Sequence, residues 1–337
     1  MNHTPISILS EKPQIKSSMY PHRGCNGLKP KQHTLYSIHI APASLIIGAI
    51  FLCLTATTQA AKLPPNMVQI PAGEYTIGSN KTDDKNQQKE FGFIEPLFVD
   101  EHPLHTVKIP AFLIDKYEVT NTQFKKFVLA TNHPAPTAWV QNGYNVSEKR
   151  LAAFKLDFLR RVATEYFLLD MDTTTMSHKQ LLKELLKIQR AQDNLPVMSV
   201  TWSDAQKYCT WLKKRLPTEN EWEIAARGKQ GYEYPWGNVF DIKKTNGGQA
   251  NDKLADRNQD NPIAPIGSYP EDKSPFGVMD MAGNVSEWVD DWYQPYAGST
   301  YRSKYYGTTE KGIRGSSASV GHYALPMFFR TALRAHM

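Results

Sequence analysis

Residues 39–61 contain no Lys, Arg, Asp or Glu, and this uncharged run divides the chain into two parts. Two lysines stand shortly before the run, and Ala60 and Ala61 close it. A basic region, a short apolar run and a cleavage site with small residues are typical of a secretory signal. We therefore expect residues 1–61 to be a signal peptide and the remaining chain to fold in the periplasm or outside the cell.

An alternative use of the same run is an uncleaved membrane anchor. Its most apolar part, residues 41–57, is shorter than the roughly 20 apolar residues that a membrane span usually needs. The sequence before the run is long for a signal, and Met19 is a second candidate start. The sequence leaves both the anchor and the later start open.

Loss of the signal would leave one cysteine, because Cys25 and Cys53 precede Ala61 and only Cys209 follows it. One thiol cannot form an internal disulfide, so stability must come from a hydrophobic core. The remaining 276 of 337 residues suffice for one large domain or two small ones.

The charge of the chain argues against a nucleic-acid partner. Five Lys or Arg residues and one Glu in residues 1–61 account for +4 of the net charge of +6, which leaves +2 for residues 62–337. No basic stripe interleaved with aromatic residues is present in this part.

Local patterns predict a mixture of short strands and helices. Val68–Gly78 reads as a strand, a turn and a strand, and Val107–Ile114 as one further strand. Capping boxes predict helices that begin at Thr120, at Ser203 and at Thr218, with Gln123, Gln206 and Glu221 as the respective partners.

The helix from Ser203 is expected to run to Arg215 with Cys209 on its inner face, as a packed thiol rather than a reactive one. The helix from Thr218 is expected to end at Gly228, and its glutamates suit a helix start better than an acid catalyst.

Residues 145–193 have a different pattern and predict a helical insert. Leu151, Phe154 and Leu159 fit one amphipathic helix. Ser177 and Gln180 form a further capping box, before a second helix with Leu181 and Leu185 on one face. Both helices are expected to pack on each other or over a ligand groove.

A series of motifs in a fixed order carries a family resemblance. The motifs are residues 67–78 (MVQIPAGEYTIG), 100–105 (DEHPLH), 115–124 (DKYEVTNTQF), 196–205 (PVMSVTWSDA), 215–223 (RLPTENEWE), 234–238 (YPWGN), 276–288 (FGVMDMAGNVSEW) and 314–317 (RGSS). Together they resemble the formylglycine-generating enzyme, or sulfatase-modifying factor, family. The resemblance covers about Met67 to Arg334, apart from the insert. It implies an α+β fold, a variant of the C-type lectin fold with little regular secondary structure, over residues 62–337.

The resemblance also implies which chemistry is missing. Enzymes of this family oxidise a sulfatase cysteine to formylglycine and bind copper through two cysteines that precede a C-terminal Arg-x-x-x-Arg. Here that interval, residues 318–329, contains no cysteine, and soft Cu(I) favours thiolates. His322 and Met327 are the remaining candidate copper ligands, and a surface histidine and a structural methionine are the preferred interpretation. We therefore expect no formylglycine-generating activity and no copper.

Two kinds of site residue carry over from the family. The expected ligand groove consists of Arg314, Ser317, Arg330, Arg334 and Trp288, although Ser286 replaces a family tryptophan. The expected structural calcium is held by Asp280, Gly283, Val285 and Glu287, and a weaker second calcium by Asn251 and Asp260, with Asn258 as the alternative to Asp260. Calcium suits these hard oxygen donors, whereas the competing interpretation is that the carboxylates only cap turns. The cluster at Asp100, Glu101, His102 and His105 is expected to be structural.

The preferred functional hypothesis is an exported member of the family that binds, or helps to mature, a peptide or small metabolite. One branch of the family works in the periplasm on siderophore maturation, and the analogy rests on fold and compartment only. The first alternative is an oxidase with a non-cysteine copper site. The second is a non-catalytic scaffold that binds a protein partner through the helical insert.

Overall fold

The computed structural model describes residues 63–247, 263–318 and 326–337. The predicted export signal, residues 1–61, lies outside these ranges, as do Asn251, Asn258 and Asp260 of the predicted second calcium site and His322 of the candidate copper site. Within the described ranges, no helix combines the length and the apolar character that crossing a membrane requires.

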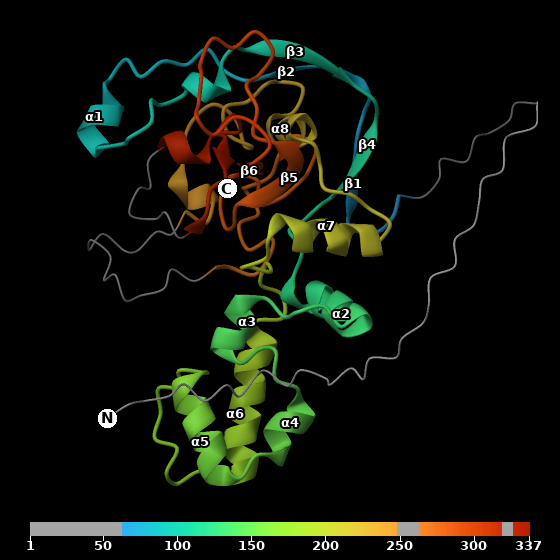
Figure 1. The fold of residues 1–337 in the computed structure, drawn as a ribbon, viewed down its shortest axis with the longest axis vertical. Helices are drawn as coiled ribbons and strands as arrows, with labels where there is room; N and C mark the ends of the chain where they lie inside the picture. The colour runs from blue at the N-terminus through green and yellow to red at the C-terminus, as the bar shows by residue number, and fades with distance from the viewer. Residues whose placement is uncertain (1–62, 248–262, 319–325) are drawn as a thin grey trace, which may run out of the picture. The chain divides into compact units, whose positions relative to one another are not determined.

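The described strands form three small antiparallel sheets (Figure 1). Strand β1 pairs with β4, β2 pairs with β3, and β5, β6 and β7 form a three-stranded sheet in that order. The bounds are β1 Met67–Ile70, β2 Gly73–Ile77, β3 His105–Ile109, β4 Phe112–Asp115, β5 Glu287–Trp292, β6 Lys311–Arg314 and β7 Ala335–His336.

The predicted strand over Val107–Ile114 is divided into two strands that belong to different sheets. Strand β3 ends at Ile109 and β4 begins at Phe112, on either side of Pro110. Proline has no N–H to contribute to a ladder, so the chain leaves one sheet there and joins another. The predicted strands in Val68–Gly78 are confirmed as β1 and β2, but they pair with β4 and β3 rather than with each other.

The described helices are short, and side-chain caps begin several of them. Their bounds are α1 Gln87–Phe91, α2 Asn121–Thr131, α3 Thr137–Asn142, α4 Glu148–Ala153, α5 Leu156–Glu165, α6 His178–Ala191, α7 Trp202–Trp211 and α8 Glu219–Arg227, with 3-10 turns η1 Val99–Glu101, η2 Ile242–Lys244 and η4 Pro326–Phe329. The predicted capping boxes at Thr120, Ser177 and Thr218 are confirmed, and Gly228 ends α8.

The predicted start and end of α7 are wrong. Thr201 caps the helix with Asp204 as its partner, two residues before the predicted box at Ser203. The indole of Trp202 donates a hydrogen bond to the carbonyl of Val289 and fixes the first turn against β5 (2.9 Å). The helix ends at Trp211 rather than at Arg215, because Lys213 adopts a left-handed conformation (φ 58°).

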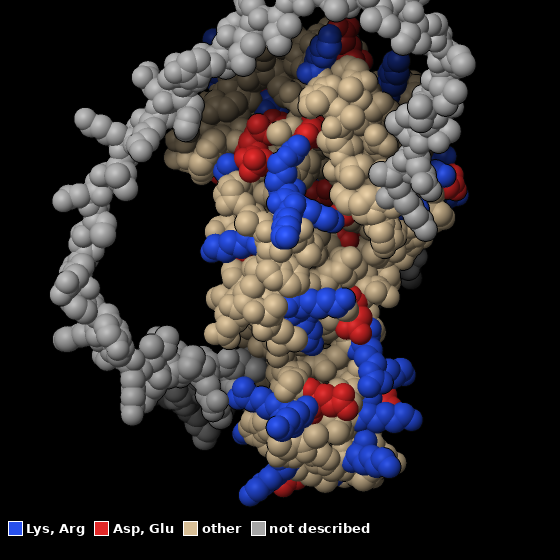
Figure 2. Space-filling view, turned by 90° about the vertical axis from the view of Figure 1, so that its right-hand side faces the viewer, with Lys and Arg blue, Asp and Glu red and all other residues tan. Residues whose placement is uncertain are grey.

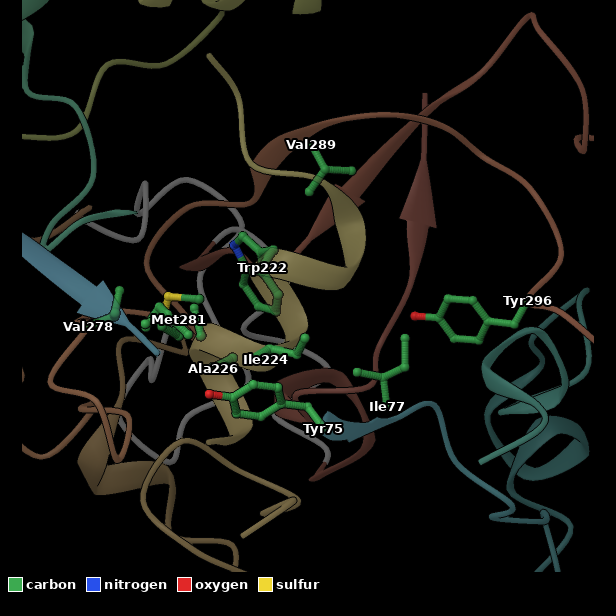
Figure 3. Packing of buried hydrophobic residues seen from close by; sticks show 11 residues of the cluster. Tyr75, Ile77, Trp222, Ile224, Ala226, Val278, Met281, Val289 and Tyr296 are labelled. Atoms are coloured by element: carbon green, nitrogen blue, oxygen red, sulfur yellow. The ribbon is translucent and has the colours of Figure 1, made fainter. Parts of the chain in front are cut away.

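The main hydrophobic core surrounds α8. Trp222, Ile224, Ala225 and Ala226 of this helix are fully buried, and α8 contacts β2, β5 and β6. Figure 3 shows Trp222 close to Met281, with Tyr75, Ile77 and Val289 contributed by the neighbouring strands. A separate aromatic cluster, which includes Phe124 of α2 and Tyr208 of α7, packs these two helices together.

The predicted helical insert contains three described helices instead of two. Leu151 lies on α4 and Leu159 on α5, so the expected first helix is broken near Phe154. Helix α6 packs against α4 and α5 and buries Leu181 and Leu185 completely. Figure 2 shows Lys and Arg side chains spread over this helical segment, with Asp and Glu between them.

Two buried hydrogen-bond donors tie the base of α6 to the preceding chain. The amide of Gln189 donates to the carbonyl oxygens of Gly143 (2.7 Å) and Val146 (2.9 Å). The hydroxyl of Tyr144 donates to the carboxylate of Asp193 (2.7 Å). The insert is therefore fixed to the loop after α3 by polar contacts as well as by apolar packing.

Candidate functional site

Helix α8 carries two glutamates into the protein interior. Thr218 and Glu221 form the N-terminal cap of the helix, and Glu219 and Glu223 lie against the C-terminal segment, where they contact Arg334 and Arg314. Glu223 is fully buried, and Glu219 retains 5% of its surface. A buried carboxylate requires a cation or several hydrogen-bond donors, and both glutamates have them.

The predicted groove arginines are these internal partners rather than open ligand groups. Arg314 is fully buried and contacts Glu223 (2.8 Å) and Glu219 (3.2 Å). Arg334 is bidentate to Glu219, with distances of 2.7 Å and 2.8 Å. Burial would raise the pKa of Glu223, but the charges of Arg314 and Arg227 hold it below its ordinary value.

Arg330 forms a second ion pair of the same kind. Its guanidinium is bidentate to Glu101 (2.7 Å and 2.8 Å) and also contacts Glu233 (2.9 Å). Glu101 belongs to the predicted structural cluster, and its neighbour Asp100 accepts a hydrogen bond from the hydroxyl of Tyr293 (2.7 Å). The remaining groove residues lie elsewhere: Ser317 is half-buried just after β6, and Trp288 lines a cleft beside α7.

A second group of four carboxylates surrounds the predicted calcium loop. Asp280 and Glu287 were predicted from the motif, and the structure adds Glu118 and Asp272. Burial, followed by repulsion from the neighbouring carboxylates, raises the pKa of Glu118 well above its ordinary value. Burial is also the main cause that raises the pKa of Glu287 to about 7, and Asp272 shows the same value. Among the described residues, no Lys or Arg forms an ion pair with any of the four.

The N–H and O–H groups that donate to these carboxylates are neutral, and the carboxyls of Asp280 and Glu118 also hydrogen-bond with each other. Asp280 accepts from the backbone N–H of Gly267 (2.7 Å), and Glu287 accepts from the indole of Trp222 (2.8 Å). Asp272 accepts from the hydroxyl of Thr245 (2.6 Å), and Glu118 from the amide of Asn284 (3.1 Å). The positive charge that balances the other buried carboxylates of this protein is missing here from the described part of the chain.

The backbone of the same loop offers further oxygen donors. The carbonyls of Ala282 and Asn284 accept hydrogen bonds from the N–H groups of Ser316 (3.0 Å) and Ala318 (2.9 Å). In the described part of the chain no donor reaches the alternate carbonyls, those of Gly283 and Val285. A Cβ atom on Gly283 would meet the Thr245 hydroxyl at 2.3 Å, so only glycine fits there.

This donor set fits a hard cation such as calcium, which takes six to eight oxygen ligands. No three side chains of His, Cys, Asp or Glu converge into a metal site within the described residues. Calcium would therefore need the two free carbonyls and water in addition to Asp280 and Glu287. The predicted site stays a prediction, and its four residues lie on one loop.

The single thiol of the predicted mature chain does not resemble a copper ligand. Cys209 lies on α7 beside the aromatic cluster and is half-buried. Burial, assisted by the charge of Asp115, raises the pKa of its thiol to about 11. Little thiolate is therefore present at neutral pH. Met327, a candidate copper ligand, is 4% exposed and packed in η4.

Comparisons with known proteins place these residues in a family context. The family profile described as sulfatase-modifying factor enzyme 1-like domain (FGE-sulfatase) matches residues 54–336. The chain is 31% identical to the inactive C-alpha-formylglycine-generating enzyme 2 of Bos taurus, over 68% of this chain and 71% of that protein. It is 33% identical to the formylglycine-generating enzyme of Bos taurus, over 68% of this chain and 59% of that protein.

Among solved structures, PvdO from Pseudomonas aeruginosa is similar to this chain. The sequence identity is 25%, the TM-score is 0.47, and the match covers 80% of this chain and 87% of that one.

The ion pairs of Arg314 generate a stability prediction. Replacement of Arg314 by Met removes the guanidinium that joins Glu219 and Glu223 and leaves each of them with one remaining arginine, Arg334 and Arg227 respectively. We expect this break in a buried network to cost about 3–5 kcal/mol in the free energy of unfolding. Urea denaturation measures this loss. Lys187→Met is the control, because its pair with Glu184 is long (3.9 Å) and 81% of the lysine side chain is exposed, so it should cost no more than about 1 kcal/mol. A similarly small loss of unfolding free energy in both variants would contradict the stabilising role of the Arg314 ion pairs.

The four carboxylates without cations generate a prediction about calcium and pH. Calcium that binds only the folded state at 100 times its Kd would stabilise by about 2.7 kcal/mol, so chelation should lower the melting temperature. A carboxyl whose folded pKa is raised favours folding while it is protonated and opposes folding once it ionises. In chelator, stability should therefore fall as the pH rises from about 5 through the values near 7 of Asp272 and Glu287.

Glu287→Gln is the matched variant for this test, since a glutamine oxygen can still accept the hydrogen bond from Trp222. It should remove most of the calcium dependence and flatten the pH profile. A melting temperature that is indifferent to chelator at every pH would show that no cation binds here.

Proposed function

Because the chain belongs to the sulfatase-modifying factor enzyme 1-like family, with the family's α+β fold, we propose that it is a member without formylglycine-generating activity that binds, or helps to mature, a peptide or small molecule. The observation that carries the proposal is the missing thiol pair. Residues 318–329 contain no cysteine, and the thiol of Cys209 has a raised pKa beside an aromatic cluster. One buried thiol cannot supply the two soft ligands that Cu(I) favours.

Sequence identity does not separate the active relative from the inactive one. The chain is 33% identical to the protein named formylglycine-generating enzyme and 31% identical to the protein named inactive. The proposal therefore rests on the residues that would do the chemistry. A calcium ion held by Asp280, Glu287 and the carbonyls of Gly283 and Val285 would stabilise the irregular loop between Asp280 and Glu287. It supplies no redox chemistry.

The proposed ligand site is not at the three arginines but at the cleft beside Trp288. Arg314, Arg330 and Arg334 are occupied by glutamates, and breaking these pairs to bind an anion would leave buried charges uncompensated. Of the expected groove residues, Trp288 lines an accessible cleft. A ligand site next to Trp288 is consistent with the retained fold and with the lost thiols.

The formylglycine assay tests the catalytic part of the proposal. The purified protein is incubated with copper, a reductant and a Cys-x-Pro-x-Arg peptide, and mass spectrometry follows conversion of the cysteine to an aldehyde. We expect no conversion above the rate without protein. Conversion well above that rate would overturn the proposal and favour the alternative oxidase, for which His322→Ala and Met327→Leu would be the next variants.

Export is the second part of the proposal, and the uncharged run before Lys62 supports it. A signal peptidase that cuts after a small residue would leave an N-terminus near Ala61 or Lys62. Mass spectrometry of the mature protein from its host measures this terminus. Intact cytoplasmic protein that begins at Met1 would contradict export.

A further inference from the structure

An apolar cleft of about 340 Å³ lies beside Trp288, away from the buried arginines. Strand β4, the segment before α7, α7 itself and the loop before β5 form its walls. The apolar lining residues include Phe112, Ile114, Val197, Val200, Tyr208, Met279 and Val285. Its volume lies at the lower end of the range of about 300–1,000 Å³ that is usual for small-molecule sites.

The walls of this cleft keep accessible surface, unlike the core around Trp222. Phe112, Val200, Val285 and Trp288 are all half-buried, and Ser286 is exposed. Apolar side chains that retain water contact inside a concavity gain free energy when an apolar molecule covers them. The cleft is therefore shaped and lined for an occupant with an apolar body.

The charged residues around the cleft favour an occupant whose polar group is cationic rather than anionic. Its two basic residues are already paired, Lys214 with Asp115 (2.6 Å) and Arg215 with Glu221 (2.6 Å). Two carboxylates in its lining, Glu118 and Glu287, have no Lys or Arg partner among the described residues. An anionic ligand would find no free cation here, whereas a cationic ligand would find a free carboxylate.

Glu118 is a cleft carboxylate that is not a predicted calcium ligand and that pairs with no Lys or Arg of the described residues. The amide of Asn284 donates to its two oxygens (3.1 Å and 3.3 Å), and the carboxyl of Asp280 shares a hydrogen bond with Glu118. Glu118 is half-buried and lines the cleft, so an ammonium group in the cleft can reach it. Glu287, by contrast, is a predicted calcium ligand and accepts a hydrogen bond from the indole of Trp222.

We propose that this cleft binds a small amphipathic amine, with its apolar body between β4 and α7 and its ammonium group paired with Glu118. The inference deepens the proposed ligand-binding function by naming the class of ligand. It does not depend on the formylglycine assay, because binding is measured without any chemical conversion. The hydrogen bond from an ammonium to a carboxylate is charge-assisted and discriminates against neutral and anionic analogues of the same size.

Three probes of equal chain length test this charge preference at pH 7. They are n-octylammonium, 1-octanol and octanoate, and isothermal titration calorimetry gives their affinities for the whole mature protein. An alkylammonium is charged at this pH, as lysine is. We expect n-octylammonium to bind at least about tenfold more tightly than 1-octanol, and octanoate to bind most weakly. Equal affinities for the three probes, or a preference for octanoate, would overturn the proposal.

Two variants separate the carboxylate from the cavity. Glu118→Gln should bring n-octylammonium within about twofold of 1-octanol and leave 1-octanol binding unchanged. Ser286→Trp should fill the cleft and weaken all three probes, whereas Leu129→Trp, at a 75% exposed position on α2, should not. Melting curves identify any variant that fails to fold. Even then, the three probes on the unaltered protein still test whether the cleft prefers the ammonium. An unchanged preference in folded Glu118→Gln would refute the role of Glu118.

Calcium distinguishes the amine site from the metal site. The titrations are repeated with excess calcium and with chelator, and the preference for n-octylammonium should persist in both. If calcium abolishes n-octylammonium binding, Glu118 belongs to the metal site and the proposal fails.

Discussion

The pairing of Arg314 with the two glutamates of α8 is the interaction on which the rest of the fold depends. Arg314 ends β6, and Glu219 and Glu223 lie on a helix about 90 residues earlier in the chain. Glu223 also accepts hydrogen bonds from the N–H of Gly78 (2.6 Å) and from the hydroxyl of Tyr296 (2.7 Å). One buried carboxylate thus joins β2, α8, β6 and the loop after β5. In a protein with short strands, such contacts replace the long ladders that hold other sheets together.

The sequence predicted local structure where the determining residues are neighbours. A capping box is complete within four residues, and three of the four predicted boxes are present. The error at α7 arose because Thr201–Asp204 and Ser203–Gln206 both have the spacing of a box. The contact that distinguishes them, between Trp202 and Val289, spans 87 residues. The sequence did not indicate strand partners for the same reason, since β1 and β2 are adjacent in sequence but each pairs with a strand across a long loop.

The site residues also depend on contacts between residues that are far apart in the sequence. The motif predicted Arg314, Arg330 and Arg334 as ligand-groove residues, but a sequence does not reveal that each guanidinium already has a carboxylate partner. Those partners lie 91, 229 and 115 residues away. Glu118 lies within a recognised motif and was missed because its neighbour Asp280 is 162 positions later in the sequence. Asp272 carries no local signal, because its raised pKa results from burial in the folded chain and from the nearby carboxylate of Asp280.

The two sets of buried carboxylates obey one physical rule with different outcomes. A carboxylate removed from water needs a compensating positive charge, or it takes up a proton. Around α8 the chain supplies arginines, and the pKa of Glu223 is held low. Around the loop from Asp280 to Glu287 the described chain supplies none, and the pKa values of Glu118, Asp272 and Glu287 are raised. Balancing this second set therefore requires something that the described part of the polypeptide does not provide, such as protons, a metal ion, or the cationic group of a ligand. Glu118 and Glu287 also line the apolar cleft, so the charge state of this set and occupation of the cleft are coupled through shared side chains.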